Sequence, residues 1–342
     1  MLNCSHTHNA PLTAPWGPWL KDKDLSFHRF LPERLTEITK KAVENLTEVR
    51  AFTAREPFQI GFNRRLVKDG KVIMAGNPDG AVIPWVDVLG FVSKDDVLVA
   101  SLFTHAAHPV IVHDTSKLIS GDYPGFAVQQ VKRKAKRGIH LFFQGCAGNI
   151  NAFPLKGGLD AAMAAGRELG DAAYRGLTTS SPVAVRGSIK SASLDLKLPL
   201  RPPPPAAELR EIIAKEKNAG KRARRERLLE IAESGKVPSM EMPMRVFKIG
   251  DVSLLAMAHE PFAEYQHFLE KHSPFSCTMA FGYTNGLECY VGTETDYLMA
   301  DKGGYETSPY GAALMFESRL PLAPKAEGII QKGLIELLKK VE

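Results

Sequence analysis

The sequence predicts an α/β fold in which a central mixed sheet is flanked by helices and carries a charged helical excursion. Short apolar runs typical of buried strands, such as Val97 to Phe103, alternate with longer stretches of helical spacing, such as Leu159 to Tyr174. With 342 residues, of which 44% are hydrophobic, the chain can bury a large core. This alternation favours helices packed on a sheet over an all-helical or all-strand architecture.

The first elements follow this pattern. Pro32 to Leu46 carries apolar residues at helical spacing and is followed by a strand-like run. The buried strand that begins at Val97 ends in Thr104-His105-Ala106-Ala107-His108-Pro109, and polar groups at the end of a central strand are a usual place for a site. Ile139 to Phe143 is a second strand of this kind, and it runs into a glycine-rich turn.

The middle of the chain contains a proline-led helical insertion, expected at about 201–236. Arg201 is followed by four prolines, which form a stiff spacer because proline fixes φ and cannot join a sheet interior. The stretch from Ala206 to Ser234 is highly charged, and Gly220 and its neighbours are expected to split it into two helices. We expect this excursion to pack on a single catalytic domain spanning residues 1–342.

A hairpin and a terminal helix complete the pattern. The strand-like runs 245–249 and 252–257 flank Gly250-Asp251, which is a strong turn signal. The second run delivers His259-Glu260-Pro261, and the closing stretch from Ile329 to Val341 is amphipathic at helical spacing. The hairpin therefore gives a further place where polar side chains follow a strand.

The composition excludes several classes of protein. No apolar run approaches the roughly 18 residues that a membrane-spanning helix needs. The first residues lack the charged and apolar regions of a secretory signal, and the four scattered cysteines form no CxxC pair. A cytoplasmic location is the default expectation, whereas a secreted or periplasmic location stays open if the N-terminus is truncated.

The net charge of +6 raises the question of a nucleic-acid partner. Much of the surplus lies in two clusters, Lys132 to Arg137 and Lys221 to Arg225. The second cluster lies inside a segment that is also rich in glutamate, as on a solvated helix face, and neither cluster accompanies a recognised nucleic-acid motif. No nucleic-acid partner is expected. A basic surface at Lys132–Arg137 that binds nucleic acid or anionic lipid stays open as an alternative hypothesis.

Polar side chains that suit a metal follow three of the predicted strands. They are His6 and His8, His105 and His108, and His259 and Glu260. Imidazoles and a carboxylate are the ligands that zinc prefers, and three protein ligands plus water make a catalytic site. Alternate residues of an extended strand share one face, so the two histidines of the first pair can approach one ion. Equally, a strand-end histidine can be an ordinary buried residue with a hydrogen-bond partner.

Ordered motifs add a family resemblance to this pattern. Ser5 to Pro11 resembles the zinc-binding S-[ST]-H-T-H-S-G-P stretch of neutral/alkaline (non-lysosomal) ceramidases, so the chain resembles a divergent, bacterial-type member of that family. Further blocks occur in the family's order along nearly the whole chain. Asn63-Arg64 corresponds to the family's N-R-S-P motif, and His259 to Phe262 corresponds to its P-G-E-F turn. His108-Pro109-Val110, together with residues 117–125, corresponds to the block H-P-[VT]…H-L-V-S-G-D-N-K-G. Gly282 to Asn285, with Cys289-Tyr290-Val291 and Gly304-Tyr305-Glu306, corresponds to the run G-x-x-N-x-Y-x-x-Y-[IV]…Y-E-G.

The resemblance implies a zinc-dependent hydrolase that cleaves a linear amide, ceramide-like or a smaller N-acyl amine, by attack of zinc-activated water. It places the activity in lipid, and specifically sphingolipid, metabolism. The implied zinc ligands are His6, His108, Glu260 and Tyr290. The implied catalytic residues are His8, Arg64, Asn151 and Tyr290.

Each implied catalytic residue type suits this chemistry. Arg64 would stabilise an oxyanion or clamp an anionic or polar part of the substrate. His8 would exchange a proton with the water or the leaving amine. Tyr290 would donate its phenol proton to the oxyanion, although a core aromatic is the plain alternative for this residue.

The chain departs from the family in its glycine-rich loop. The serine of the family's G-D-V-S-P-N loop is Asn151 here and the aspartate is Asn149, while Lys117 replaces a histidine. Asn151 can hydrogen-bond a substrate carbonyl but cannot act as a nucleophile. An alternative is therefore a non-catalytic relative that binds a metal or a lipid-like ligand.

The ends of the chain also differ from the family. The family has a longer segment before its histidine motif and an immunoglobulin-like domain at its C-terminus, neither of which is found here. Met1-Leu2-Asn3 leaves almost no strand to anchor His6. Either the sequence starts at an internal methionine, or the first sheet elements have been lost. The sequence does not indicate an oligomeric state.

Overall fold

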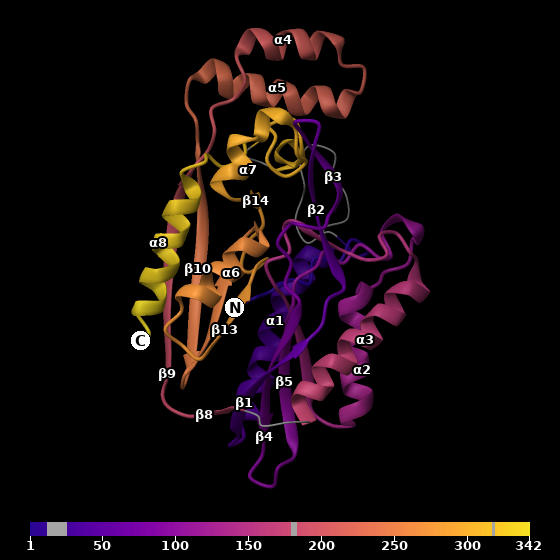
Figure 1. Ribbon diagram of the computed structural model, residues 1–342, viewed down its shortest axis with the longest axis vertical. Coiled ribbons are helices and arrows are strands. Elements are labelled where there is room, and N and C mark those ends of the chain that lie inside the picture. The colour runs from indigo at the N-terminus through magenta and orange to yellow at the C-terminus, as the bar shows by residue number, and fades with distance from the viewer. Residues whose placement is uncertain (12–25, 179–182, 317–318) are drawn as a thin grey trace.

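Two mixed sheets form the centre of the molecule (Figure 1). The computed structural model describes residues 1–11, 26–178, 183–316 and 319–342. The first sheet has the order β6-β5-β4-β1-β8, with β1 (Arg50–Pro57), β4 (Trp85–Val92), β5 (Leu98–His105), β6 (Ile139–Gln144) and β8 (Val183–Val185). The second has the order β13-β11-β10-β9, with β9 (Ile189–Pro199), β10 (Ser239–Ile249), β11 (Val252–Met257) and β13 (Cys277–Phe281). In each sheet one pair is parallel, β5 with β6 and β11 with β13, and the others are antiparallel.

The predicted α/β class with a mixed sheet is confirmed, and the strands are distributed over more than one sheet. The predicted hairpin forms with Ile249 opposite Val252, and β5 and β6 begin and end within two residues of the predicted runs. Alternate residues divide the faces of the first sheet, as the period of two requires. Val88 and Phe103 belong to the core under the helices, whereas Leu89 packs in a cluster that includes residues of the second sheet.

Two small sheets bring distant parts of the chain together. β2 (Gly61–Lys68) lies between β3 (Lys71–Asn77) and β7 (Ile150–Ala152). The two-residue strands β12 (Glu260–Pro261) and β14 (Tyr290–Val291) pair in parallel and set Glu260 beside Tyr290. These short pairings, rather than the large sheets, position most of the residues that the sequence singled out.

Helices α2 (Asp122–Ala135) and α3 (Leu159–Thr178) lie side by side against the first sheet (Figure 1). Their close approach depends on Gly166 and Gly170 in α3. A Cβ at Gly166 would lie 2.5 Å from the Cβ of Phe126 and 2.6 Å from the carbonyl oxygen of Tyr123. The absence of a side chain there lets the two helix backbones pack directly.

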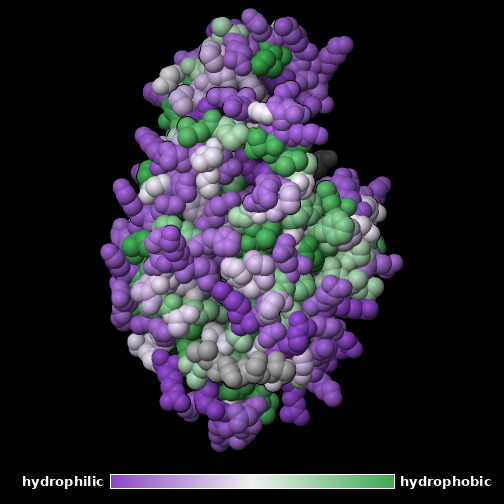
Figure 2. Space-filling view, viewed as in Figure 1, coloured by the Kyte–Doolittle hydropathy of each residue, from purple (hydrophilic) through white to green (hydrophobic). Residues whose placement is uncertain are grey.

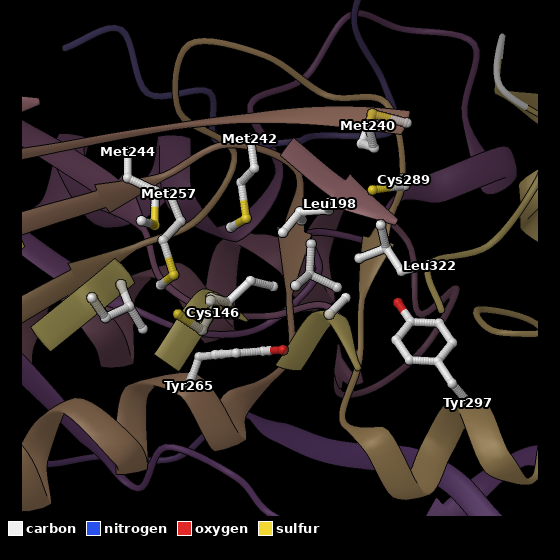
Figure 3. Close-up of a cluster of buried hydrophobic side chains, with 14 of the residues drawn as sticks. Cys146, Leu198, Met240, Met242, Met244, Met257, Tyr265, Cys289, Tyr297 and Leu322 are labelled. Carbon is white, nitrogen blue, oxygen red and sulfur yellow. The ribbon is translucent and has the colours of Figure 1, made fainter. Parts of the chain in front are cut away.

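The second sheet packs on α8 (Ala326–Lys339) and α6 (Ala263–His272) through a methionine-rich core (Figure 3). Met240, Met242 and Met244 alternate along β10 and are buried with Met257. Flexible thioether side chains fill irregular spaces well. Cys146, which follows β6, and Cys289, which precedes β14, belong to the same core.

The predicted excursion forms the helical hairpin of α4 (Ala206–Lys215) and α5 (Ala219–Ser234) at one end of the molecule (Figure 1). The expected division into two helices near Gly220 is present, but its exact position differs: Gly220 lies in the first turn of α5, and the helices separate at 216–218. Asn218 explains the difference, because its side chain caps α5 by accepting a hydrogen bond from the backbone N–H of Lys221 at 3.0 Å.

The remaining helical elements are short or lie at the start of the chain. They are α1 (Ser26–Glu44), α7 (Glu294–Leu298) and the 3₁₀ turns η2 (His113–Thr115), η3 (Ala300–Lys302) and η4 (Ala312–Met315). α1 begins earlier than the predicted Pro32. Within the described residues, none of the helices combines the length and the apolar character needed to cross a bilayer.

The close packing of α2 on α3 gives a stability prediction. Gly166→Ala is expected to lower the free energy of unfolding by about 1–3 kcal/mol, because overpacking outweighs the better helix propensity of alanine. Gly328→Ala in α8 is the matched control, since a Cβ there meets nothing within 4 Å; this variant is expected to gain up to about 1 kcal/mol. Urea unfolding followed by circular dichroism measures both. Equal effects would show that the α2–α3 contact does not require glycine.

Candidate metal centre

Asparagine side chains hold the N-terminal segment by hydrogen bonds on both sides of its His6-Thr7-His8 turn. Asn3 donates from its amide to the carbonyl oxygen of Gly282 at 2.8 Å and accepts from the backbone N–H of Gln144 at 2.8 Å. Asn9 donates from its amide to the carbonyl oxygen of His113 at 2.6 Å. The sequence suggested that too little strand precedes the turn to hold it, but these two asparagine side chains replace a strand.

Three histidines and a glutamate converge at this turn and form the candidate centre. Ligand nitrogens of His6, His8 and His108 all lie within 4.8 Å of one another, an arrangement that could hold a metal ion. The Oε2 atom of Glu260 lies 2.9 Å from Nε2 of His108 and 3.5 Å from Nε2 of His6. Two ligand atoms about 2.0–2.1 Å from one tetrahedral zinc lie about 3.3 Å apart, so these spacings fit a shared ion.

The tautomer of His108 also fits a metal ligand. Its Nδ1 lies 2.7 Å from the carbonyl oxygen of Ala147 and 3.2 Å from that of Ile150. Both oxygens can only accept, so the proton resides on Nδ1 and the lone pair of Nε2 faces the centre. Burial lowers the pKa of His108 well below its usual value and the pKa of His6 to about 3. Both rings are therefore neutral near pH 7, as metal binding requires.

Glu260 and Tyr290 lie side by side on β12 and β14. Burial raises the pKa of the Glu260 carboxyl, while nearby His6 and a hydrogen bond from Tyr290 act in the opposite direction. Burial also raises the pKa of the Tyr290 phenol well above its usual value, so the phenol keeps its proton near neutral pH. Tyr290 is thus a proton donor at the edge of the centre, within reach of the same carboxylate.

The guanidinium of Arg64, which lies beside the centre, donates hydrogen bonds to three different acceptors. Its Nε donates to Oε1 of Glu306, one terminal nitrogen donates to Oδ1 of Asn151, and the other donates to the carbonyl oxygen of Gly148, each at 2.8 Å. Because the oxygen of Asn151 accepts from Arg64, the NH2 group of this amide is left as its donor. The replaced serine position therefore offers an N–H donor, and not a nucleophile.

Two of the predicted metal candidates lie outside the centre, which corrects the expectation from their strand ends. The Nδ1 of His105 lies 2.8 Å from the carbonyl oxygen of Trp85, and His105 is not among the histidines that converge on the centre. His259 donates from Nε2 to the carbonyl oxygen of Glu241 at 2.8 Å and accepts at Nδ1 from the backbone N–H of Glu288 at 3.0 Å. Both are hydrogen-bonded structural histidines, the plain alternative that the sequence left open.

The other two departures from the motif also have structural explanations. Asn149 accepts at its side-chain oxygen from the backbone N–H of Ala263 at 2.9 Å and donates to Oε2 of Glu264 at 2.8 Å, so it ties its loop to the start of α6. Lys117 is exposed between η2 and α2. Neither side chain contributes a ligand to the centre.

Sequence reasoning gave no role to Tyr283 or Glu306. The hydroxyl of Tyr283 lies 3.5 Å from Oε2 of Glu260, and its ring lies 4.6 Å from that of His6. Both His6 and Tyr283 have left-handed φ values, 64° and 50°. Such backbone is uncommon outside glycine and is typical of functional sites. His6 and Tyr283 each lie in a sequence block that matches a family motif, but their spacing along the chain does not predict that their side chains contact each other.

Comparison with known proteins identifies the fold. No protein-family model matches the chain, and no curated protein matches it. Solved structures do match. Among them are a ceramidase complexed with C2 (TM-score 0.62, 18% identity over 88% of this chain and 55% of that one) and the neutral ceramidase of Pseudomonas aeruginosa (TM-score 0.61, 20% identity over 89% of this chain and 54% of that one).

The chain therefore has the ceramidase fold, and the resemblance seen in its motifs is confirmed at the level of the fold. The chain spans about half the length of the structures that it matches.

The carboxyl of Glu264 gives a prediction for the pH dependence of stability. Burial raises its pKa from 4.5 to about 7, despite the hydrogen bond from Asn149. The folded state then binds more protons than the unfolded state between about pH 4.5 and 7, so this group lowers the stability of the fold as pH rises through that window. In wild type, the free energy of unfolding should therefore fall by an amount on the order of 1–3 kcal/mol across this window, and Glu264→Gln should not show this fall. Urea unfolding at several pH values measures it. Parallel profiles for the two proteins would contradict the shift.

Proposed function

We propose that this chain is a zinc-dependent hydrolase that cleaves a linear amide, in a ceramide-like lipid or a smaller N-acyl amine. The observation that supports this most directly is the convergence of His6, His108 and Glu260 at ligand spacing. The fold adds support, because both similar structures are ceramidases and one of them is a complex with C2. Fold alone does not define function, so the proposal rests on the site.

The donor set fits zinc in two arrangements. The motif resemblance favours His6, His108, Glu260 and Tyr290 as ligands. The distances between nitrogens equally allow His6, His8 and His108, with Glu260 beside them. A zinc ion held here would supply a Lewis acid that polarises a carbonyl and lowers the pKa of water toward about 7.

The side chains of the chain itself then have defined tasks. Arg64 and the NH2 group of Asn151 would donate to the substrate carbonyl, and the phenol of Tyr290 would stabilise the oxygen as it gains charge. His8 is exposed, with its ring 5.1 Å from that of His6. This position suits a residue that meets the substrate and passes a proton to the leaving amine.

A non-catalytic relative that binds a metal or a lipid-like ligand is the second candidate. The observation in its favour is Asn151, whose oxygen is occupied by Arg64 and whose amide cannot act as a nucleophile or a base. Against it, the buried polar groups around Glu260 retain their partners, which a decayed site does not need. Hydrolysis, rather than metal binding, separates the two candidates.

Removal of His108 tests the metal. His108→Ala is expected to abolish stoichiometric zinc binding and to reduce amide hydrolysis at least about 100-fold. His272→Ala, an exposed histidine at the end of α6, is the control that should keep both. Zinc analysis after dialysis and a panel of N-acyl amines and esters provide the readouts. Wild-type protein without zinc, or unchanged activity in His108→Ala, would refute the mechanism. Bound zinc without hydrolysis would favour the second candidate.

The two ligand arrangements make opposite predictions for Glu260 and His8. If Glu260 is a ligand, Glu260→Gln should weaken zinc binding by at least about 10–100-fold. His8→Ala should then keep its zinc and lose about 10²–10⁴-fold in kcat. Competition with a fluorescent chelator measures zinc affinity separately from turnover. Loss of zinc in His8→Ala with retention in Glu260→Gln would assign the ion to the three histidines instead.

A further inference from the structure

Glu306 bridges two adjacent arginines beneath the candidate centre. Its Oε1 accepts from Nε of Arg64 at 2.8 Å, and its Oε2 accepts from a terminal nitrogen of Arg65 at 2.5 Å. All three side chains are buried, at 3%, 4% and 7% exposure for Glu306, Arg64 and Arg65. Arg65 also donates to Asp296 at 3.0 Å. Successive strand residues usually point to opposite faces, but a bulge in β2 lies between Asn63 and Arg65.

The charges of this group balance. The two guanidinium groups of Arg64 and Arg65 face the two carboxylates of Glu306 and Asp296. Outside this group, the carboxyl of Glu260 also lies close to Arg64. A buried charge without a partner is costly, so Glu306 compensates a cation that the fold could not otherwise bury. Although burial disfavours the charged guanidinium, nearby Tyr290 and Glu306 raise the pKa of Arg64 above its ordinary value. Arg64 therefore stays charged but is already neutralised by its surroundings.

We propose that Glu306 is the positioning residue for Arg64 and makes the centre select an uncharged acyl group over one that carries a carboxylate. This inference rests on the proposed amide hydrolysis and resolves one of its open points, since Arg64 could in principle clamp an anionic or a neutral part of the substrate. A substrate carboxylate at Arg64 would meet a guanidinium already paired with Glu306 and would lie near Glu260. A neutral carbonyl avoids this repulsion and still accepts an N–H.

The orientation of Arg64 follows from the same contact. Glu306, Asn151 and the carbonyl of Gly148 each accept from a different nitrogen, so the plane of the guanidinium cannot rotate. Glu306 accepts from Nε of Arg64, whereas Asn151 accepts from a terminal nitrogen, and Glu306 would act on a substrate only through Arg64. Loss of the Glu306 carboxylate would allow the guanidinium plane of Arg64 to rotate and would leave the charge of Arg64 without its partner. The first effect changes substrate selectivity and turnover, and the second changes anion binding.

Anion binding measures the charge signature without turnover. The zinc-loaded wild-type protein, titrated calorimetrically with sodium sulfate, is expected to bind weakly. Glu306→Gln should bind sulfate at least about tenfold more tightly, because a buried cation loses its partner. The double variant Arg64→Met/Glu306→Gln should lose this gain, which excludes sulfate on the metal. Asp296→Asn removes the other carboxylate of the group, does not touch Arg64, and should resemble the wild type.

Kinetics measures the selectivity signature. Glu306→Gln should lower kcat/KM for a neutral N-acyl amine and raise the relative rate for an acyl chain that ends in a carboxylate. A folded Glu306→Gln with wild-type sulfate affinity and wild-type selectivity would overturn the inference. If that variant does not fold, Glu306→Asp carries the test: its shorter side chain keeps the charge but cannot span both arginines, so kcat should fall at least about tenfold with little change in KM. A wild-type kcat would overturn the positioning role.

The proposed amide hydrolysis and the proposed role of Glu306 can be refuted independently of each other. If no variant hydrolyses any amide but sulfate binding still follows Arg64 and Glu306, the charge balance stands and the proposed reaction is wrong. If amides are hydrolysed and sulfate affinity is unchanged by Glu306→Gln, the reaction stands and the role of Glu306 is wrong.

Discussion

The contact between His108 and Glu260 joins the two halves of the molecule, and much of the site depends on it. His108 follows β5 of the first sheet, and Glu260 follows β11 of the second. The turn between β6 and β7 packs against both residues, and only glycine fits at its closest point: a Cβ on Gly148 would lie 2.4 Å from the carbonyl oxygen of Glu260. The same turn supplies the carbonyl of Ala147 that fixes the His108 tautomer. The backbone is therefore arranged around this pair.

Buried polar groups must be paired, and this requirement organises the rest of the site. The guanidinium of Arg64 needs several acceptors, and it takes one from β7, one from the preceding turn and one from the 3₁₀-rich segment that contains Glu306. Segments that are far apart in the sequence are thereby tied to one another. The site is a polar junction between apolar cores. On the face of the molecule seen in Figure 2, hydrophilic and hydrophobic residues are intermixed.

Asn151 shows how one fold can host altered chemistry. The ceramidase fold places this residue opposite Phe62 on β2 and beside His108. An amide at this position accepts from Arg64 and offers N–H groups to a substrate, whereas the hydroxyl of the family's serine could both donate and accept. The fold is kept while the hydrogen-bonding groups at this position differ from those of the family's motif.

The sequence alone determined the α/β class, the main strands, the terminal helix and the motif order, because apolar periodicity and turn residues act locally. It also selected His6, His108, Glu260 and Arg64, whose side chains do meet in the structure. The strand-end pattern alone did not separate them from His105 and His259, since a strand end reveals a residue's position but not its direction; the motif resemblance made that distinction. The partners of Arg64, the asparagine anchors of the N-terminal segment and the role of Glu306 depend on contacts between residues far apart in the chain. Only tertiary packing decides such contacts, because they arise where two sheets and several loops must satisfy one another's buried polar groups.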